Sequence, residues 1–289
     1  MHSSRMELEL VHVTTRDGIV LAGAYFEPHG TPPEGVDAVV FLHGDGGNFY
    51  SPLYLNLGSH LATAGIACLV ANRRGHDLVS HGVSGGPLAG YAFESVSDAP
   101  LDFRSWLDFL VLRGHTRVAL GGHSGGAVRA VYAQATVQFP EAAAVVSVSP
   151  GEYRHAGVVG VHGADFVNAF ERAEQLVEDA QPHSLSVPGL PWGSMWSAEA
   201  YVDCFNRDNR YSVSQHVANT GRPTLFTFGA AECEGPEVLQ VCGLACADIS
   251  AAQLSHVDVQ VIAGANHSYQ GRESELYEAI SEWLVRLKK

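Results

Sequence analysis

Short apolar runs alternate with amphipathic stretches along the first half of the chain. The apolar runs are rich in Val, Leu and Ala, a pattern typical of buried strands, and lie at residues 38–42, 67–71, 117–120 and 143–148. The stretches between them carry apolar residues at helical spacing, at residues 52–65, 97–113 and 125–138. Strands that alternate with helices predict a mostly parallel sheet with helices packed against it.

An antiparallel strand pair is expected ahead of this alternation. Residues 7–14 and 19–25 are both β-rich, and Arg16-Asp17-Gly18 separates them. The Asp-Gly step favours a tight hairpin turn. Together with two later apolar runs, at residues 224–228 and 257–262, the pattern predicts a sheet of about eight strands.

The alternation stops between residues 151 and 222. Helical pieces in this segment lie around residues 166–178 and 197–205. After the strands resume, a last helix is predicted from apolar residues at helical spacing: Leu276, Ala279, Ile280, Trp283, Leu284 and Leu287. We therefore expect a core formed by residues 1–150 and 223–289, interrupted by a helical insertion at residues 151–222.

The composition is that of a globular protein with a sizeable core. The chain has 289 residues, 46% of them apolar and 17% charged, which suits one α/β domain. A formal net charge of -14 disfavours partners held by phosphate contacts, so we expect no nucleic-acid partner. The first ten residues lack a secretory signal, and no run approaches the roughly 18 apolar residues of a membrane span. These features lead us to expect a cytoplasmic protein.

The five cysteines are odd in number and spread through a chain too long to need disulfides for its stability. Reduced thiols are the simpler interpretation. Cys242 and Cys246 stand four positions apart near Cys233, which leaves a metal clip or a disulfide open, although the spacing matches no common zinc pattern. The sequence also lacks a His-Glu-x-x-His element, and we expect neither a metal nor a cofactor.

The pattern Gly-x-Ser-x-Gly, which places a nucleophilic serine at a sharp strand-to-helix turn, occurs twice. Around Ser84 it is preceded by a polar stretch and followed by Pro87, so neither a strand nor a helix flanks it. Around Ser124 it follows the apolar run at 117–120 and precedes the helical stretch from Gly125. The sequence therefore predicts that Ser124 is the nucleophile and that Ser84 lies in a loop.

Two backbone amides are expected to stabilise the oxyanion that forms when a serine attacks a carbonyl. The first is that of Gly125, because the amides at a helix N-terminus are unpaired and lie at the positive end of the helix dipole. After the strand at 38–42 comes His43-Gly44-Asp45, and here the sequence resembles the α/β-hydrolase superfamily. The resemblance implies that the amide of Asp45 is the second donor, with Gly46 in reserve. An acidic residue departs from the commoner apolar one, and its carboxylate would have to point away from the oxyanion.

A serine hydroxyl needs a neighbouring imidazole as its base. His267 lies between the last predicted strand and the last helix, where the superfamily carries this base. His256 precedes that strand and is expected at the opposite edge of the sheet, whereas His43 and His123 are expected to have packing roles.

The resemblance also implies a carboxylate after the seventh strand, to orient the imidazole. Glu232 stands at the matching spacing, although the superfamily usually has aspartate there. Glu234 and Glu152 remain alternatives, the latter because it follows the sixth strand. The order nucleophile, acid, histidine agrees with the α/β-hydrolase fold.

The resemblance implies an α/β-hydrolase fold, in which the insertion after the sixth strand is expected to be a helical lid. The predicted function is a serine hydrolase that cleaves a small, neutral or lipophilic carboxylic ester through an acyl-enzyme intermediate. A thioesterase, a lactonase or amidase, a C–C bond hydrolase and a non-hydrolysing ligand-binding protein remain alternatives. The partner expected is a small-molecule substrate, and the oligomeric state stays open. Aromatic residues of the insertion could line the substrate site or form the core of the lid.

Overall fold

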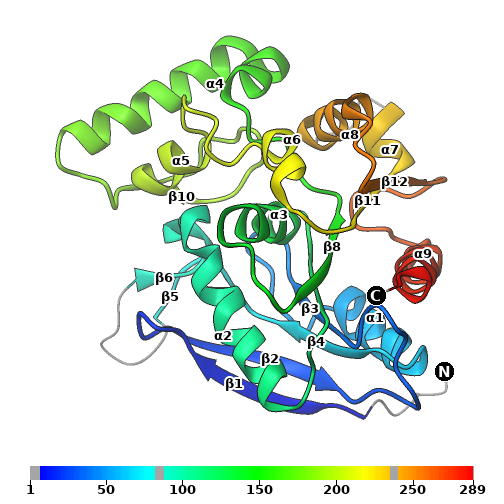
Figure 1. Cartoon of the computed structure of the whole chain (residues 1–289). Coiled ribbons are helices and arrows are strands. Elements are labelled where there is room, and N and C mark those ends of the chain that lie inside the picture. Colours follow the sequence, from blue (N-terminus) through cyan, green and yellow to red (C-terminus); the bar gives the residue numbers. More distant parts are fainter. Residues whose placement is uncertain (1–6, 82–87, 235–239, 289) are drawn as a thin grey trace.

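The computed structural model describes residues 7–81, 88–234 and 240–288, and these residues contain an eight-stranded sheet (Figure 1). The strands, in spatial order, are β1 (Glu9–Thr14), β2 (Val20–Phe26), β4 (Ala67–Ala71), β3 (Ala38–Leu42), β7 (Val118–His123), β8 (Ala142–Val148), β11 (Thr224–Gly229) and β12 (Val257–Ile262). The pairs β1–β2 and β2–β4 are antiparallel, and the pairs from β4 to β12 are parallel. The expected mostly parallel sheet of about eight strands is confirmed.

Helices cover both faces of the sheet. On one face lie α1 (Pro52–Thr63) and α9 (Glu273–Arg286), and on the other lie α2 (Ala99–Leu112), α3 (Gly125–Val137) and α8 (Gln240–Ala252). Strand β3 shows why both faces are buried: Phe41 belongs to the same core as Leu57 and Trp283, whereas Val40 belongs to that of Phe103 and Val131. Alternate side chains of this strand therefore contribute to two separate hydrophobic cores.

A helical segment lies between β8 and β11. It contains α4 (His155–Glu178), α5 (Ala198–Cys204), α6 (Val213–His216) and a short pair of strands, β9 (Leu185–Ser186) and β10 (Trp196–Ser197). In Figure 1, α4 and α5 form the green layer above α3. Helix α4 begins before the helical piece expected from residue 166. The sequence signal is weak there because Gly163, with a φ of 61°, interrupts the helix.

Most aromatic residues of this segment pack against one another. Among those that are at most 2% exposed are Phe166, Phe170, Trp196, Tyr201 and Phe205. Their rings are neighbours, as in the Tyr201–Phe205 pair, whose centroids are 5.3 Å apart. These five residues form the core of the segment, whereas Trp192 is half-buried and lines a cavity described below.

Several shorter elements were not expected from the sequence. They are β5 (Ser80–His81), β6 (Leu88–Ala89), α7 (Ala230–Glu234) and the 3-10 turns η1 (Tyr91–Phe93), η2 (Val96–Asp98) and η3 (Val217–Asn219). Helix α8 was not expected either, because its run of Ala, Cys and Gly gives little contrast between two faces. Ser84, predicted to lie in a loop, is outside the described residues. Among the helices described, none is both long enough and apolar enough to cross a membrane.

Candidate active site

Ser124 lies between the end of β7 and the start of α3, in the strand–turn–helix setting that its motif requires. Its φ of 55° and ψ of -122° are rare for a residue with a side chain. The Ser124 amide donates a hydrogen bond to the carbonyl of Val148 at 2.8 Å, which ties the turn to β8. A methyl group at Gly122 would overlap the backbone of Gly126, so glycine is needed for the strand and the helix to approach this closely.

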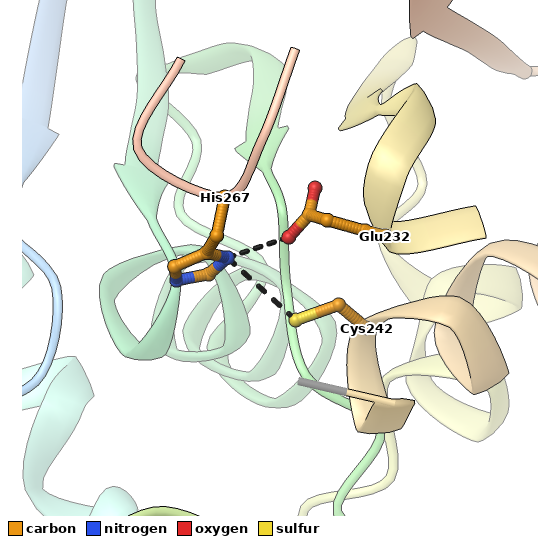
Figure 2. A group of neighbouring side chains, drawn as sticks. All are labelled: Glu232, Cys242 and His267. Carbon is orange, nitrogen blue, oxygen red and sulfur yellow. Dashed lines mark hydrogen bonds and ion pairs between the residues drawn. The ribbon is translucent and has the colours of Figure 1, made fainter. Parts of the chain in front are cut away.

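A chain of hydrogen bonds joins Ser124, His267 and Glu232. The hydroxyl oxygen of Ser124 lies 3.0 Å from Nε2 of His267, and Nδ1 of the same ring lies 2.5 Å from Oε1 of Glu232. Figure 2 shows the second contact, between the loop after β12 and the short helix α7. The distances fit an imidazole that bridges a hydroxyl group and a carboxylate.

Glu232 is also held in place by groups other than His267. Its Oε2 accepts hydrogen bonds from the hydroxyl of Ser149 at 2.6 Å and from the amide of Gly229 at 2.7 Å. Burial by itself would raise the pKa of Glu232, but the hydrogen bond and charge of His267, with the bonds from Ser149 and Gly229, lower it below its ordinary value. The carboxylate is therefore ionised and oriented toward His267.

Of the other two candidate acids, Glu152 is not in this position. Glu152 is buried, but its Oε2 accepts a hydrogen bond at 3.1 Å from the amide of Ser214, near the start of α6. The side chain of Glu234 lies outside the described part of the chain. Among the three glutamates named by the sequence, Glu232 is the one that the structure shows bonded to His267.

His123 fixes the loop that carries His267. Its Nε2 lies 2.8 Å from the carbonyl oxygen of His267, and its Nδ1 lies 3.0 Å from the hydroxyl of Tyr54. The Tyr54 hydroxyl also accepts a hydrogen bond from the amide of Gly44. The sequence could not reveal this role, because His123 and His267 stand 144 positions apart. The sequence shows only that His123 stands inside the Gly-x-Ser-x-Gly motif, and this position led to the expectation of a packing role.

The carboxylate of Asp45 does not point away from the turn at Ser124. It lies against Gly125, where an added methyl group would overlap it. Its Oδ1 is 2.6 Å from the guanidinium of Arg73 and 3.5 Å from that of Arg129, and its Oδ2 accepts a hydrogen bond from Tyr153 at 3.2 Å. The sequence shows the charge of Asp45 but not its partners, and in the structure two buried arginines compensate this charge.

These arginines belong to a buried cluster of four charges. Glu94 accepts hydrogen bonds from Arg129 and also contacts Arg73, so that two cations face two anions. Burial and the charge of Arg129 lower the pKa of Arg73 to about 10, which leaves the guanidinium protonated at neutral pH. The cluster is therefore electrically balanced beside the candidate nucleophile.

A cavity of about 280 Å³ opens onto the candidate nucleophile. Its lining includes Asp45, Ser124, Tyr153, Trp192, Cys242 and His267. A larger cavity, of about 840 Å³, lies between η2 and α5, and none of Ser124, Glu232 and His267 lines it. The smaller cavity is the one that could bring a small molecule to the hydroxyl of Ser124.

One group of side chains offers atoms that could hold a metal ion. In Glu232, Cys242 and His267 these atoms lie within 4.8 Å of one another (Figure 2). Nδ1 of His267 and Oε1 of Glu232 already form a hydrogen bond with each other. Burial and the charge of Glu232 raise the pKa of the Cys242 thiol well above its ordinary value. The arrangement as it stands therefore favours hydrogen bonding over metal ligation, since a metal requires the thiolate.

The strand order, the turn at Ser124 and the position of His267 define an α/β-hydrolase architecture. Residues 39–279 match the sequence model of the family described as "Alpha/beta hydrolase family". The chain therefore belongs to the alpha/beta hydrolase family, and this membership identifies the protein as a hydrolase in general terms. No curated protein sequence matches the chain.

Solved structures of this fold resemble the chain over nearly its whole length. Est1E from Butyrivibrio proteoclasticus is 16% identical, with 96% of this chain and 97% of Est1E covered and a TM-score of 0.62. The alpha/beta hydrolase GrgF from Penicillium sp. sh18 is 15% identical, with 97% and 99% covered and a TM-score of 0.70. An esterase domain from Rhodothermus marinus is 18% identical, with 97% and 99% covered and a TM-score of 0.60. At these identities the likeness concerns the fold.

Proposed function

We propose that the protein is a serine hydrolase that cleaves a small carboxylic ester through an acyl-enzyme intermediate. The observation that carries the proposal is the chain of hydrogen bonds from Ser124 through His267 to Glu232. A hydroxyl, an imidazole and a carboxylate in this order form the arrangement that activates serine as a nucleophile.

In the proposed mechanism, Ser124 attacks the carbonyl carbon while Nε2 of His267 takes its proton. The imidazolium that forms is stabilised by the ionised Glu232 and then donates the proton to the leaving alcohol. A water molecule, deprotonated by His267, attacks the acyl-enzyme and releases the acid. We assign the oxyanion to the amides of Gly125 and Asp45, because Gly125 opens α3 and the helix dipole favours negative charge there.

The cavity supports a small substrate without a net charge at its reacting end. The acidic side chain in its wall, Asp45, is compensated by Arg73 and Arg129, so the wall does not present an unbalanced charge there. Trp192 and Tyr153 add aromatic surface. We propose that residues 151–222 act as a lid, since Trp192 of this segment lines the cavity beside Ser124.

A panel of activated esters of increasing acyl length tests this function. We include an ester of ferulic acid, because Est1E, which resembles this chain in fold, also has a solved structure with ferulic acid bound. Ser124→Ala is expected to lower turnover by at least about a thousandfold at every chain length. Ser84→Ala removes the serine of the same five-residue pattern and is expected to behave as wild type. Equal rates for wild type and Ser124→Ala would overturn the proposal.

The same panel separates bond types. Thioesters, amides and diketones of matched acyl length are compared with the esters. We expect the highest kcat/KM for the esters. A higher value for another bond type would replace the ester assignment while it left the serine mechanism in place.

A further inference from the structure

Three of the five cysteines lie close to the candidate acid Glu232. Cys233 follows it on α7, and Cys242 and Cys246 lie on the facing helix α8. All five cysteines are in the described part of the chain, and none is disulfide-bonded there. The sulfur atoms of Cys233 and Cys246 are nevertheless only 2.9 Å apart, as the Cys233 thiol donates to Cys246. A disulfide requires a separation of about 2.05 Å, so the two sulfurs need to approach by roughly 0.9 Å.

We propose that Cys233 and Cys246 are an oxidisable pair. They form an intramolecular disulfide with each other when a diffusible low-molecular-weight disulfide oxidises them by thiol–disulfide exchange. The thiolate of one cysteine attacks a sulfur of the reagent and releases one small thiolate. The second cysteine then attacks the mixed disulfide and releases the other. The two protein thiols are oxidised, the reagent disulfide is reduced, and the two protons leave on the two small thiols.

Exposure of the two residues sets the order of these steps. Cys233 is half-buried, whereas Cys246 is 8% exposed, so a solvent reagent reaches Cys233 more easily. Once the mixed disulfide forms on Cys233, the neighbouring Cys246 acts as the resolving thiol. The proximity of the two sulfurs makes this second step intramolecular, with the rate advantage that such steps have.

Cys242 is near the same pair but has a different environment. It is 2% exposed, and its sulfur lies 3.7 Å from the carbonyl oxygen of Ser149 and 3.8 Å from Nδ1 of His267. Burial and the nearby Glu232 raise the pKa of its thiol well above the ordinary value. Since the thiolate is the reactive form, Cys242 stays reduced while Cys233 and Cys246 react.

The disulfide would join the helix that carries Glu232 to the helix packed on it. A methyl group at Gly243 of α8 would overlap the backbone carbonyl of Glu232, which shows how closely the two segments pack. Because the sulfurs are already adjacent, the bond can form while Glu232 keeps its hydrogen bond to His267. We expect the oxidised protein to unfold several degrees higher than the reduced protein, since the bond restricts the unfolded chain.

The test starts from the fully reduced protein and adds oxidised glutathione. Thiols are counted after denaturation, and the new linkage is located by peptide mapping. Wild type should fall from five thiols to three with a peptide that links Cys233 and Cys246. Cys233→Ser and Cys246→Ser should not form this linkage, whereas the control Cys204→Ala should form it.

The mapping of wild-type protein decides the outcome even if a variant folds poorly. Five thiols after prolonged oxidation, a stable glutathione adduct without the internal linkage, or a linkage that involves Cys242 would each overturn the proposal. The readout does not depend on enzymatic activity, so its failure and that of the proposed ester hydrolysis can be told apart. We also expect the oxidised protein to retain esterase activity. This expectation rests on the proposed function.

Discussion

The imidazole ring of His123 lies against that of His267, with ring centroids 4.8 Å apart and an angle of 39° between the planes. Burial, followed by the charge of His267, lowers the pKa of His123 to about 4. His123 is therefore neutral at physiological pH. A neutral ring can donate from Nε2 to the carbonyl of His267 while it accepts at Nδ1 from the hydroxyl of Tyr54. In this way it fixes the loop of the candidate base without adding a second positive charge.

This depressed pKa predicts a loss of stability in mild acid. The unfolded imidazole binds a proton below pH 6.5, whereas the folded one does so only below about pH 4. Between these values the unfolded state binds more protons, so the free energy of unfolding falls as the pH falls. For His123 the total loss is roughly 3 kcal/mol.

Urea unfolding from pH 7 to pH 4 checks this contribution. His123→Gln cannot titrate, so its free energy of unfolding should fall less steeply with pH than that of wild type. The comparison between the two proteins removes the contributions of the other histidines. Parallel curves for wild type and His123→Gln would show that His123 does not titrate in this way.

Replacement of Glu232 by glutamine separates the candidate acids. Glu232→Gln removes the negative charge that stabilises the imidazolium and alters the proton arrangement at Nδ1, so kcat should fall by about a thousandfold or more. Glu152→Gln changes a buried glutamate that is bonded to Ser214 instead, and the folded variant should keep its kcat. Steady-state ester hydrolysis measures both. A larger loss for Glu152→Gln than for Glu232→Gln would reassign the acid.

The buried charge cluster predicts a large stability difference between two arginine variants. Arg73→Met leaves Asp45 and Glu94 partly uncompensated in a buried site, and should lower the free energy of unfolding by roughly 3 to 5 kcal/mol. Arg272→Met removes an exposed arginine that pairs with Glu275 on α9, and should leave stability unchanged within error. Denaturant unfolding at pH 7 compares them. Equal stability of the two variants would contradict a structural role for the cluster.

The substitution Gly125→Ala tests whether the close approach of the Asp45 side chain to the start of α3 matters for activity. A methyl group at Gly125 would overlap the Asp45 carboxylate, which Arg73 prevents from moving aside. Displacement of this loop should lower kcat/KM of Gly125→Ala by about 100-fold or more. Gly160→Ala is the control, because an added methyl group on this exposed position of α4 meets no atom within 4 Å. Wild-type kinetics for Gly125→Ala would show that the loop can relax without loss.

The fold was predictable where the sequence pattern is periodic and buried. The strand alternation predicted the parallel part of the sheet, and the Asp17-Gly18 step predicted the antiparallel pair that opens it. Helix α8 was not predicted, because its alanine, cysteine and glycine residues offer little contrast between a buried and an exposed face. Helix α4 was predicted to start late, since Gly163 interrupts its pattern.

The candidate site was predictable as a set of loops but not as a set of contacts. Loops that follow parallel strands meet at one edge of a sheet, which supported Ser124 as the nucleophile, whereas Glu232 was named from the resemblance to the α/β-hydrolase superfamily. The choice between Glu232 and Glu152 depended on which side chain reaches the imidazole. The compensation of Asp45 by Arg73 depended on a contact between different loops, for which one sequence carries no signal.

The most direct test of the proposed mechanism identifies the residue that becomes covalently modified. Wild-type protein is treated with a fluorophosphonate, which reacts with an activated serine, and the adduct is located by peptide mapping. We expect one adduct on Ser124, none on this peptide in Ser124→Ala, and slower labelling in Glu232→Gln. An adduct on Ser84 or on another residue, or no adduct at all, would contradict the proposed mechanism.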